Sequence, residues 1–238
     1  MIDAGLSLKE LTRRLAEIGE SPEDLDAVLI THEHSDHIAG LNRLIRFREK
    51  KKKPIAVFIS KLTAPLLEWD GREAAPPMEL FQAGSGWMLG NIAVQSFTIP
   101  HDANDPVGFT FLAEGVKTAV ATDLGYIPDS VRMHLRRTQI LLLESNHDLD
   151  MLKVGPYPWS IKQRVMGRNG HLSNMVTCEF LEQDLDSGVQ KLILGHISEQ
   201  NNHPAIVRMS AEQSLEKRGI APQLVLAQQK QQTEVFAF

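Results

Sequence analysis

Hydrophobic residues along the chain follow two alternating patterns. In one, leucines recur every three or four residues, as at Leu8, Leu11 and Leu15, which is typical of an amphipathic helix. In the other, short apolar runs are flanked by turn residues, which predicts strands. Together these patterns predict helices near residues 7–18, 38–47, 128–136, 147–153, 158–166, 173–186 and 203–217, and strands near 26–31, 55–59, 87–89, 92–99, 107–113, 116–121, 140–143, 191–194, 223–227 and 233–237.

The middle of the chain is its most β-rich part. The pairs Gly90-Asn91 and Glu114-Gly115 separate alternating apolar segments and predict two hairpins within residues 87–121. From about residue 128 helices and strands alternate, and no internal repeat or linker interrupts them. We therefore expect one α/β domain over residues 1–238, with a mixed sheet covered by helices.

Composition and charge narrow the class of protein. Of the 238 residues, 42% are hydrophobic and 23% are charged, which is typical of a globular protein. The net charge of -5 leaves only a local basic patch to bind nucleic acid. The single cysteine, Cys178, excludes an internal disulfide and fits a reducing compartment. No apolar run reaches the roughly 18 residues of a membrane span and no secretory signal begins the chain, so we expect a cytoplasmic protein without a membrane partner.

The densest cluster of chemically active residues follows the predicted strand 26–31. Three histidines and an aspartate fall within six residues, in the segment Thr31-His32-Glu33-His34-Ser35-Asp36-His37. Residues i and i+2 of an extended segment point to the same side, so His32 and His34 can share one metal ion. The turn into the next helix aims Asp36 and His37 elsewhere, which favours two metals over histidines that cap a helix or pack in a core.

Three further candidate ligands each end an apolar, strand-like segment. His101 follows FTIP, Asp123 follows TAVAT, and His196 follows KLILG. Side chains at strand ends converge on one edge of a sheet, where α/β proteins usually keep their sites. Each residue alone is more often a turn residue, but together they supply the ligands that a two-metal site needs.

This order of ligands resembles the metallo-β-lactamase superfamily of hydrolases over essentially the whole chain. The resemblance implies a four-layer αββα sandwich. It also implies that one metal is held by His32, His34 and His101, the other by Asp36, His37 and His196, and that Asp123 bridges them.

Within the superfamily, Asp123 argues against a true β-lactamase, which has cysteine or serine at that place. Segments 143–148, 155–159, 168–174 and 195–202 are similar to the YycJ (WalJ) group. That resemblance implies a bacterial cytoplasmic nuclease that degrades DNA from 5′ to 3′. Members usually begin with further strands, so we expect this chain to be shortened at its N-terminus by about 20 to 30 residues.

The ligand types suit Zn²⁺ or Mn²⁺, and Fe²⁺ also fits. Two such ions would lower the pKa of a bridging water and provide hydroxide at neutral pH. We predict that Asp36 is both a ligand and the group that orients the hydroxide. His171 is predicted to protonate the leaving oxygen, the alternative being that it flanks the N-cap of a helix.

Contacts to a DNA substrate are predicted around His171. Basic residues surround it in sequence, and the helix N-terminus that follows favours a phosphate. Tyr157 and Trp159 can stack on bases, although Trp159 can equally pack in the core, and the basic run 46–53 is more typical of a solvated loop. The predicted substrate contacts are Lys162, Arg164, Arg168, Ser173 and Asn174.

Other functions remain open on the same residues. A hydrolase of a small ester, thioester, cyclic phosphodiester or β-lactam would use the same metal site. A glyoxalase would be expected to add a helical substrate domain, and a tRNA-processing enzyme a long inserted arm, and neither is found in the sequence. A non-catalytic metal-binding module is least favoured, because all seven ligands are present.

Overall fold

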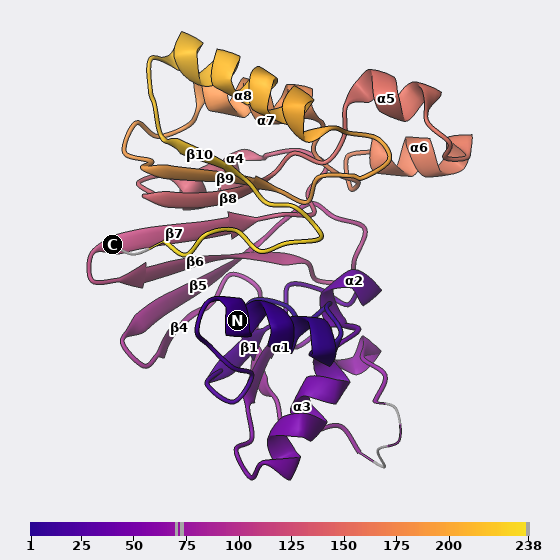
Figure 1. The fold of residues 1–238 in the computed structure, drawn as a ribbon, viewed down its shortest axis with the longest axis vertical. Helices are drawn as coiled ribbons and strands as arrows, with labels where there is room; N and C mark the ends of the chain where they lie inside the picture. Colours follow the sequence, from indigo (N-terminus) through magenta and orange to yellow (C-terminus); the bar gives the residue numbers. More distant parts are fainter. Residues whose placement is uncertain (70, 72–73, 237–238) are drawn as a thin grey trace. The chain divides into compact units, whose positions relative to one another are not determined.

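The computed structural model describes residues 1–69, 71 and 74–236. The chain forms two compact units, each built on its own sheet (Figure 1). Unit 1 comprises Met1–Ala83 and Ala103–Val107, and unit 2 comprises Gly84–Asp102 and Gly108–Phe238. The single domain over residues 1–238 stays a prediction.

Unit 1 holds a small parallel sheet with helices packed against it. Its strands are in the order β1-β2-β3, and both pairs are parallel. The elements are α1 (Leu8–Glu17), β1 (Ala27–Leu29), α2 (Ser35–Ile38), α3 (Leu41–Lys50), β2 (Ala56–Ser60), the 3₁₀ helix η1 (Ala64–Leu66) and β3 (Glu79–Phe81).

The helix α3 of unit 1 is held against the sheet by a hydrophobic core. Leu41 and Leu44 of α3 are buried in one cluster with Val28 of β1 and Val57 of β2. The first residues of the chain lie beside β1, because Ile2 forms a parallel bridge with Leu29. This pairing carries the residues after Ile2 to the carboxyl end of β1.

Unit 2 holds a seven-stranded mixed sheet in the order β10-β9-β8-β7-β6-β5-β4. The pairs β4–β5 and β6–β7 are antiparallel, whereas β7, β8, β9 and β10 run parallel. The elements are β4 (Gly86–Leu89), β5 (Ile92–Thr98), β6 (Val107–Ala113), β7 (Val116–Ala121), α4 (Asp129–Leu135), β8 (Ile140–Glu144), α5 (Leu149–Val154), α6 (Trp159–Val165), α7 (Asn174–Gln183), β9 (Lys191–Gly195), α8 (Pro204–Arg218) and β10 (Gln223–Leu226).

Three helices of unit 2 share one hydrophobic core with the sheet. Val131 of α4, Phe180 of α7 and Val207 of α8 are buried in one cluster with strand residues such as Leu141 and Leu194. In Figure 1, α7 and α8 lie together over the part of the sheet that contains β8, β9 and β10. Because β7, β8 and β9 are parallel neighbours, the residues that follow them emerge at one edge of the sheet.

The α/β class and most predicted elements are confirmed. Both predicted hairpins form, and Glu114 and Gly115 have positive φ angles of 51° and 82°, as a tight two-residue turn requires. The short strand β3 was not predicted. Within the described residues no helix combines the length and the apolar character that a membrane span needs.

One predicted strand is wrong. Residues 233–236 are not in a strand, and residue 237 lies outside the described residues. Side-chain contacts take the place of backbone pairing there. The Nε2 atom of Gln223 donates to Glu234 over 2.6 Å, and the Lys191 ammonium lies 4.2 Å from the centre of the Phe236 ring.

Candidate metal centre

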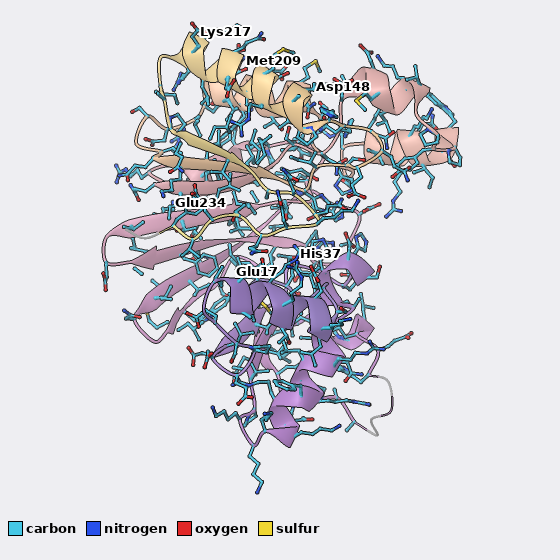
Figure 2. All side chains as sticks on the ribbon, in the orientation of Figure 1. Glu17, His37, Asp148, Met209, Lys217 and Glu234 are labelled. Atoms are coloured by element: carbon cyan, nitrogen blue, oxygen red, sulfur yellow. The ribbon has the colours of Figure 1, made fainter. Side chains whose placement is uncertain are left out.

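The histidine cluster of unit 1 lies directly after β1, on the loop that leads into α2. The centre of the His32 ring lies 4.5 Å from that of His34 and 4.1 Å from that of His37. His32 and His37 are buried, whereas the Asp36 side chain is 65% exposed. Figure 2 shows His37 projecting from the short helix α2. Unit 1 therefore brings together the four ligands predicted from this segment.

A carboxylate from the start of the chain fixes this loop. Oδ1 of Asp3 accepts the backbone N–H of Thr31 over 2.8 Å, and Oδ2 accepts the Thr31 hydroxyl, also over 2.8 Å. Oδ2 of Asp3 also lies 2.7 Å from Nδ1 of His37. With Nδ1–H donating to Asp3, Nε2 of His37 keeps its lone pair for a metal ion.

The same logic extends to His32. Its Nδ1 atom lies 3.0 Å from the hydroxyl oxygen of Thr31. Because that hydroxyl donates its own proton to Asp3, its oxygen accepts from Nδ1–H of His32. Nε2 of His32 is then also left as an acceptor, so Asp3 sets the protonation pattern of two histidines.

Gly5 allows the start of the chain to approach this loop. A Cβ atom at Gly5 would lie 1.5 Å from the carbonyl oxygen of Asp36, which no side chain can tolerate. Next to it, the Ala4 N–H donates to the carbonyl of His37 over 2.7 Å. The segment around Asp3 and the histidine loop are therefore one packed structure.

The second group of candidate ligands lies at the carboxyl edge of the sheet of unit 2. Asp123 follows β7, Glu144 ends β8 and His196 follows β9. Asp123 and His196 have φ angles of 62° and 55°, in the left-handed region that residues with a side chain seldom adopt. Such backbone strain concentrates at functional sites, where surrounding contacts hold it.

Glu144 holds two histidines at once. Its Oε1 atom lies 2.8 Å from Nδ1 of His171 and 2.8 Å from Nδ1 of His196. Its Oε2 atom accepts the backbone N–H groups of Leu124 and Leu172 over 3.0 Å and 3.2 Å. Glu144 is fully buried, and these four contacts occupy both oxygens. It therefore fits an orienting role better than a metal-binding one.

The pKa values of these groups follow from the same contacts. Burial raises the pKa of Glu144, but the hydrogen bonds from His171 and His196 outweigh burial and hold it below its usual value. Burial lowers the pKa of His171, but the Glu144 carboxylate outweighs this and raises it. For His101 burial dominates, and its pKa lies below the usual range.

The remaining ligands of unit 2 lie around Asp123. Its Oδ1 atom is 3.3 Å from Nε2 of His196 and 3.8 Å from Nδ1 of His171. Nδ1 of His101 lies 3.1 Å from the carbonyl oxygen of Gly170, and the His101 ring is 5.1 Å from the His171 ring. Unit 2 thus brings His101, Asp123, His171 and His196 together.

These donor sets fit divalent transition-metal ions. Imidazole nitrogens and carboxylate oxygens are the ligands of Zn²⁺, Mn²⁺ and Fe²⁺ sites. When a histidine binds a metal through one ring nitrogen, its other ring nitrogen almost always donates to a carboxylate or a carbonyl. The Nδ1 atoms of His37, His101 and His196 each have such a partner. The orienting carboxylates Asp3 and Glu144 were not predicted from the sequence, although Glu144 ends an apolar strand as the predicted ligands do.

Some of the residues predicted to bind substrate form hydrogen bonds within the protein. Ser173, two residues beyond His171, caps α7 by accepting the N–H of Val176. Asn174 is buried and exchanges hydrogen bonds with Asn202. Lys162 is buried as well, whereas Arg164 and Arg168 are exposed. Substrate binding by these residues stays a prediction.

Known proteins are similar to this chain in sequence and in fold. A family model described as "Beta-lactamase superfamily domain" matches residues 1–197. The exodeoxyribonuclease WalJ of Streptococcus pneumoniae is 36% identical over 213 residues, which is 88% of this chain and 77% of that protein. The exodeoxyribonuclease YycJ of Bacillus anthracis is 34% identical over 220 residues, or 92% of this chain and 81% of that protein.

Among solved structures, the metallo-β-lactamase fold protein YhfI of Bacillus subtilis superimposes with a TM-score of 0.73. It is 17% identical, and the match covers 95% of this chain and 83% of YhfI, so it bears on the fold alone. The family model and this fold match support the αββα class expected above. The chain therefore belongs to the metallo-β-lactamase superfamily of metal-dependent hydrolases and, within it, to the YycJ-like proteins.

Proposed function

We propose that this protein is a nuclease that removes nucleotides from DNA in the 5′-to-3′ direction. The similarity to two exodeoxyribonucleases, at 36% and 34% identity over most of the chain, supports DNA as the substrate. The direction of attack rests on the family resemblance. The cytoplasm, where DNA is available in bacteria, is the compartment in which we expect it to act.

Two divalent ions, Zn²⁺ or Mn²⁺ with Fe²⁺ as a further candidate, complete the proposed site. When bound, they would supply a water that is nucleophilic at neutral pH and positive charge for the phosphate oxygens. His32, His34 and His101 would hold one ion, Asp36, His37 and His196 the other, and Asp123 both. The ring orientations imposed by Asp3 and Glu144 support this assignment.

The observation that carries the proposal is the shared oxygen of Glu144. It holds Nδ1 of His171 and Nδ1 of His196 at the same distance, 2.8 Å, so one carboxylate orients both rings. The Nε2 atom of His196 is 3.3 Å from Asp123 and serves as a ligand. We assign His171 as the proton donor, because the Glu144 carboxylate at its Nδ1 atom stabilises the protonated ring.

Three side chains then have defined roles in the reaction. Glu144 stays ionised and buried, and it fixes both imidazoles. His171 gives its proton to the oxygen that leaves when the phosphodiester bond breaks, because an alkoxide is a poor leaving group without it. Asp36, exposed at the start of α2, orients the attacking water.

The test is metal content together with hydrolysis of three substrates, with Mn²⁺ and with Zn²⁺ supplied. The substrates are a 5′-labelled DNA duplex, a simple phosphodiester and a chromogenic β-lactam. We expect release of mononucleotides from the labelled end. Cleavage of only the phosphodiester or the β-lactam would reject DNA and keep the metal site, and absence of bound metal would reject both.

Ligand variants sharpen this test. Asp36→Ala and Asp123→Ala should each lower hydrolysis by orders of magnitude without unfolding the protein. Asp129→Ala is the control, because Asp129 lies on α4 and its side chain is 94% exposed. Unchanged activity in both ligand variants would reject the two-metal site.

A further inference from the structure

An apolar surface is exposed on α5 and α6 of unit 2. Val154, at the end of α5, is 87% exposed, and Trp159 and Ile161, at the start of α6, are 62% and 38% exposed. The sequence left open whether Trp159 packs in the core, and its exposure excludes that. Large apolar side chains that cluster in water usually mark a binding surface. We call residues 149–165 the α5–α6 platform.

Several contacts make the platform rigid. Asp148 caps α5 by accepting the N–H groups of Asp150 and Met151 over 3.0 Å and 2.9 Å. The buried Lys162 joins the two helices, because its ammonium donates to the carbonyl of Lys153 over 2.6 Å. Figure 1 shows α5 and α6 side by side, and Figure 2 labels Asp148 at the start of α5. A rigid surface loses little entropy when it binds a ligand.

The platform is joined directly to the candidate metal ligands of its own unit. The carbonyl of Val165, the last residue of α6, accepts the backbone N–H of His171 over 2.9 Å. Arg164 of α6 forms an ion pair with Asp102, the residue next to His101. A molecule lying on the platform would therefore be close to His171, whose backbone α6 binds, and to Asp102, the neighbour of His101.

The charge of the platform favours a polyanion. The platform and the loop after it, residues 149–171, carry four basic residues and one acidic residue, and all the basic ones except Lys162 are exposed. The whole chain, in contrast, carries 30 acidic and 25 basic residues. Lys153 and Arg164 keep 56% and 58% of their side chains exposed, although each also contacts an aspartate. Arg168 lies over the Tyr126 ring, 4.3 Å from its centre. These side chains can approach phosphates while Trp159 offers an aromatic face.

We infer that the α5–α6 platform binds the unpaired end of a DNA strand, with Trp159 stacked on a base and Lys153 and Arg168 near the phosphates. The inference rests on the proposed nuclease function and adds to it the form of the substrate. The bases inside a duplex are already stacked on each other, whereas a base at an unpaired or frayed strand end can stack on the exposed indole. The platform then holds the frayed end of the strand that is being degraded and directs it toward His171.

The experiment measures binding of a fluorescent single-stranded phosphorothioate oligonucleotide to the metal-loaded protein. We compare Trp159→Leu, which keeps apolar surface but cannot stack, with Trp159→Tyr, which keeps a ring. Trp159→Leu should weaken binding by roughly tenfold, and Trp159→Tyr should restore most of it. Lys153→Ala should flatten the salt dependence of binding.

Matched controls lie elsewhere in unit 2. Met133→Ala removes an exposed side chain of α4, 66% exposed, and Arg208→Ala removes an exposed, ion-paired cation of α8. Both should bind the oligonucleotide as the original chain does. Tryptophan fluorescence gives a second readout, because part of the quenching by DNA should disappear in Trp159→Tyr although binding remains.

The outcomes separate the platform from the proposed function. If the original chain degrades DNA but Trp159→Leu binds the oligonucleotide as well as Met133→Ala, the platform is rejected and the nuclease stands. If the original chain neither binds nor degrades DNA, the nuclease fails and the platform with it. If the protein self-associates and Trp159→Leu abolishes this without weakening DNA binding, the surface is a protein interface and the inference is wrong.

Discussion

The Oδ2 atom of Asp3 lies 2.7 Å from Nδ1 of His37, a residue 34 positions further along the chain. The contact places a partly buried carboxylate behind a histidine that we propose as a metal ligand. Such a carboxylate fixes the ring and raises the basicity of the nitrogen that faces the metal. The start of the chain is thus part of the candidate metal centre.

Asp3→Asn should weaken metal binding. The amide keeps the size of the side chain but removes the negative charge that stabilises the imidazole when it ligates a cation. We expect metal affinity to fall by about 10-fold to 100-fold, as measured by titration with a competing chelator. Asp24→Asn is the control, since Asp24 also accepts a backbone N–H in unit 1 but lies in the turn after α1. Equal affinity in Asp3→Asn and Asp24→Asn would contradict the role of Asp3.

Glu144→Gln should lower both the stability of the protein and its metal content. Every donor around Glu144 points an N–H group at it, so the NH₂ group of glutamine must face at least one of them. An unsatisfied buried donor costs about 1–3 kcal/mol. We expect a lower midpoint of urea unfolding and a lower metal content.

The control for this change is Glu182→Gln, because Glu182 binds Ser214 and Lys217 at the surface of unit 2. Its urea midpoint should change by less than that of Glu144→Gln, and its metal content should stay the same. Full metal content in Glu144→Gln would show that the orientation of His196 does not depend on Glu144.

His171→Ala separates proton donation from metal binding. If His171 protonates the leaving oxygen, the variant should keep its metal content and lose about 10²-fold to 10⁴-fold in turnover. The loss should be smaller for a substrate with a nitrophenolate leaving group, which departs without a proton. A loss of metal would instead identify His171 as a ligand. A loss of equal size on both substrates would argue against proton donation.

Local sequence pattern predicted that the histidines of unit 1 lie close together. The spacing of His32, His34, Asp36 and His37 places them after a buried strand, and the structure gathers their side chains in unit 1. The role of Asp3 was not predicted, because its position depends on the parallel bridge between Ile2 and Leu29, a contact between distant parts of the sequence. Periodicity carries no information about such pairing.

The contacts of Glu144 and Lys162 likewise depend on the folded structure and could not be predicted from local sequence pattern. Glu144 ends a predicted strand, but its role depends on donors from separate loops, at Leu124, His171 and His196. Lys162 was predicted to contact substrate because basic residues surround His171 in sequence. That substrate contact stays a prediction. The Lys162 ammonium joins α6 to α5, a contact that only the packing of the two helices determines.

Gly5→Ala should displace the histidine loop. The new Cβ atom would lie 1.5 Å from the carbonyl oxygen of Asp36, a backbone atom that cannot rotate away. We expect a destabilisation of about 1–3 kcal/mol, as for overpacking in a core, together with weaker metal binding. Gly188→Ala is the control, because its Cβ would meet only a side-chain oxygen of Asp186 at 3.3 Å. Normal metal affinity in Gly5→Ala would show that this close approach does not position the ligands.

His147→Leu should make the protein less sensitive to acid. His147 is 1% exposed, and among the described residues neither of its ring nitrogens has a hydrogen-bond partner. Burial lowers the pKa of His147 from 6.5 to about 4. Between those values the unfolded chain binds a proton that the folded chain does not, so stability falls as the pH drops below 6.5.

From this histidine alone we expect the free energy of unfolding to fall by about 1 kcal/mol between pH 7.5 and 5.5, which lowers Tm by about 2–4 °C. The measurement is thermal unfolding at both pH values with a chelator present, so that loss of metal does not contribute. His147→Leu should remove this part of the pH dependence. It should not lower stability at pH 7.5, because leucine buries no polar atom at this position. Met133→Leu, which changes no titratable group, should keep the original dependence. The same slope in His147→Leu and Met133→Leu would mean that His147 is not held neutral by burial.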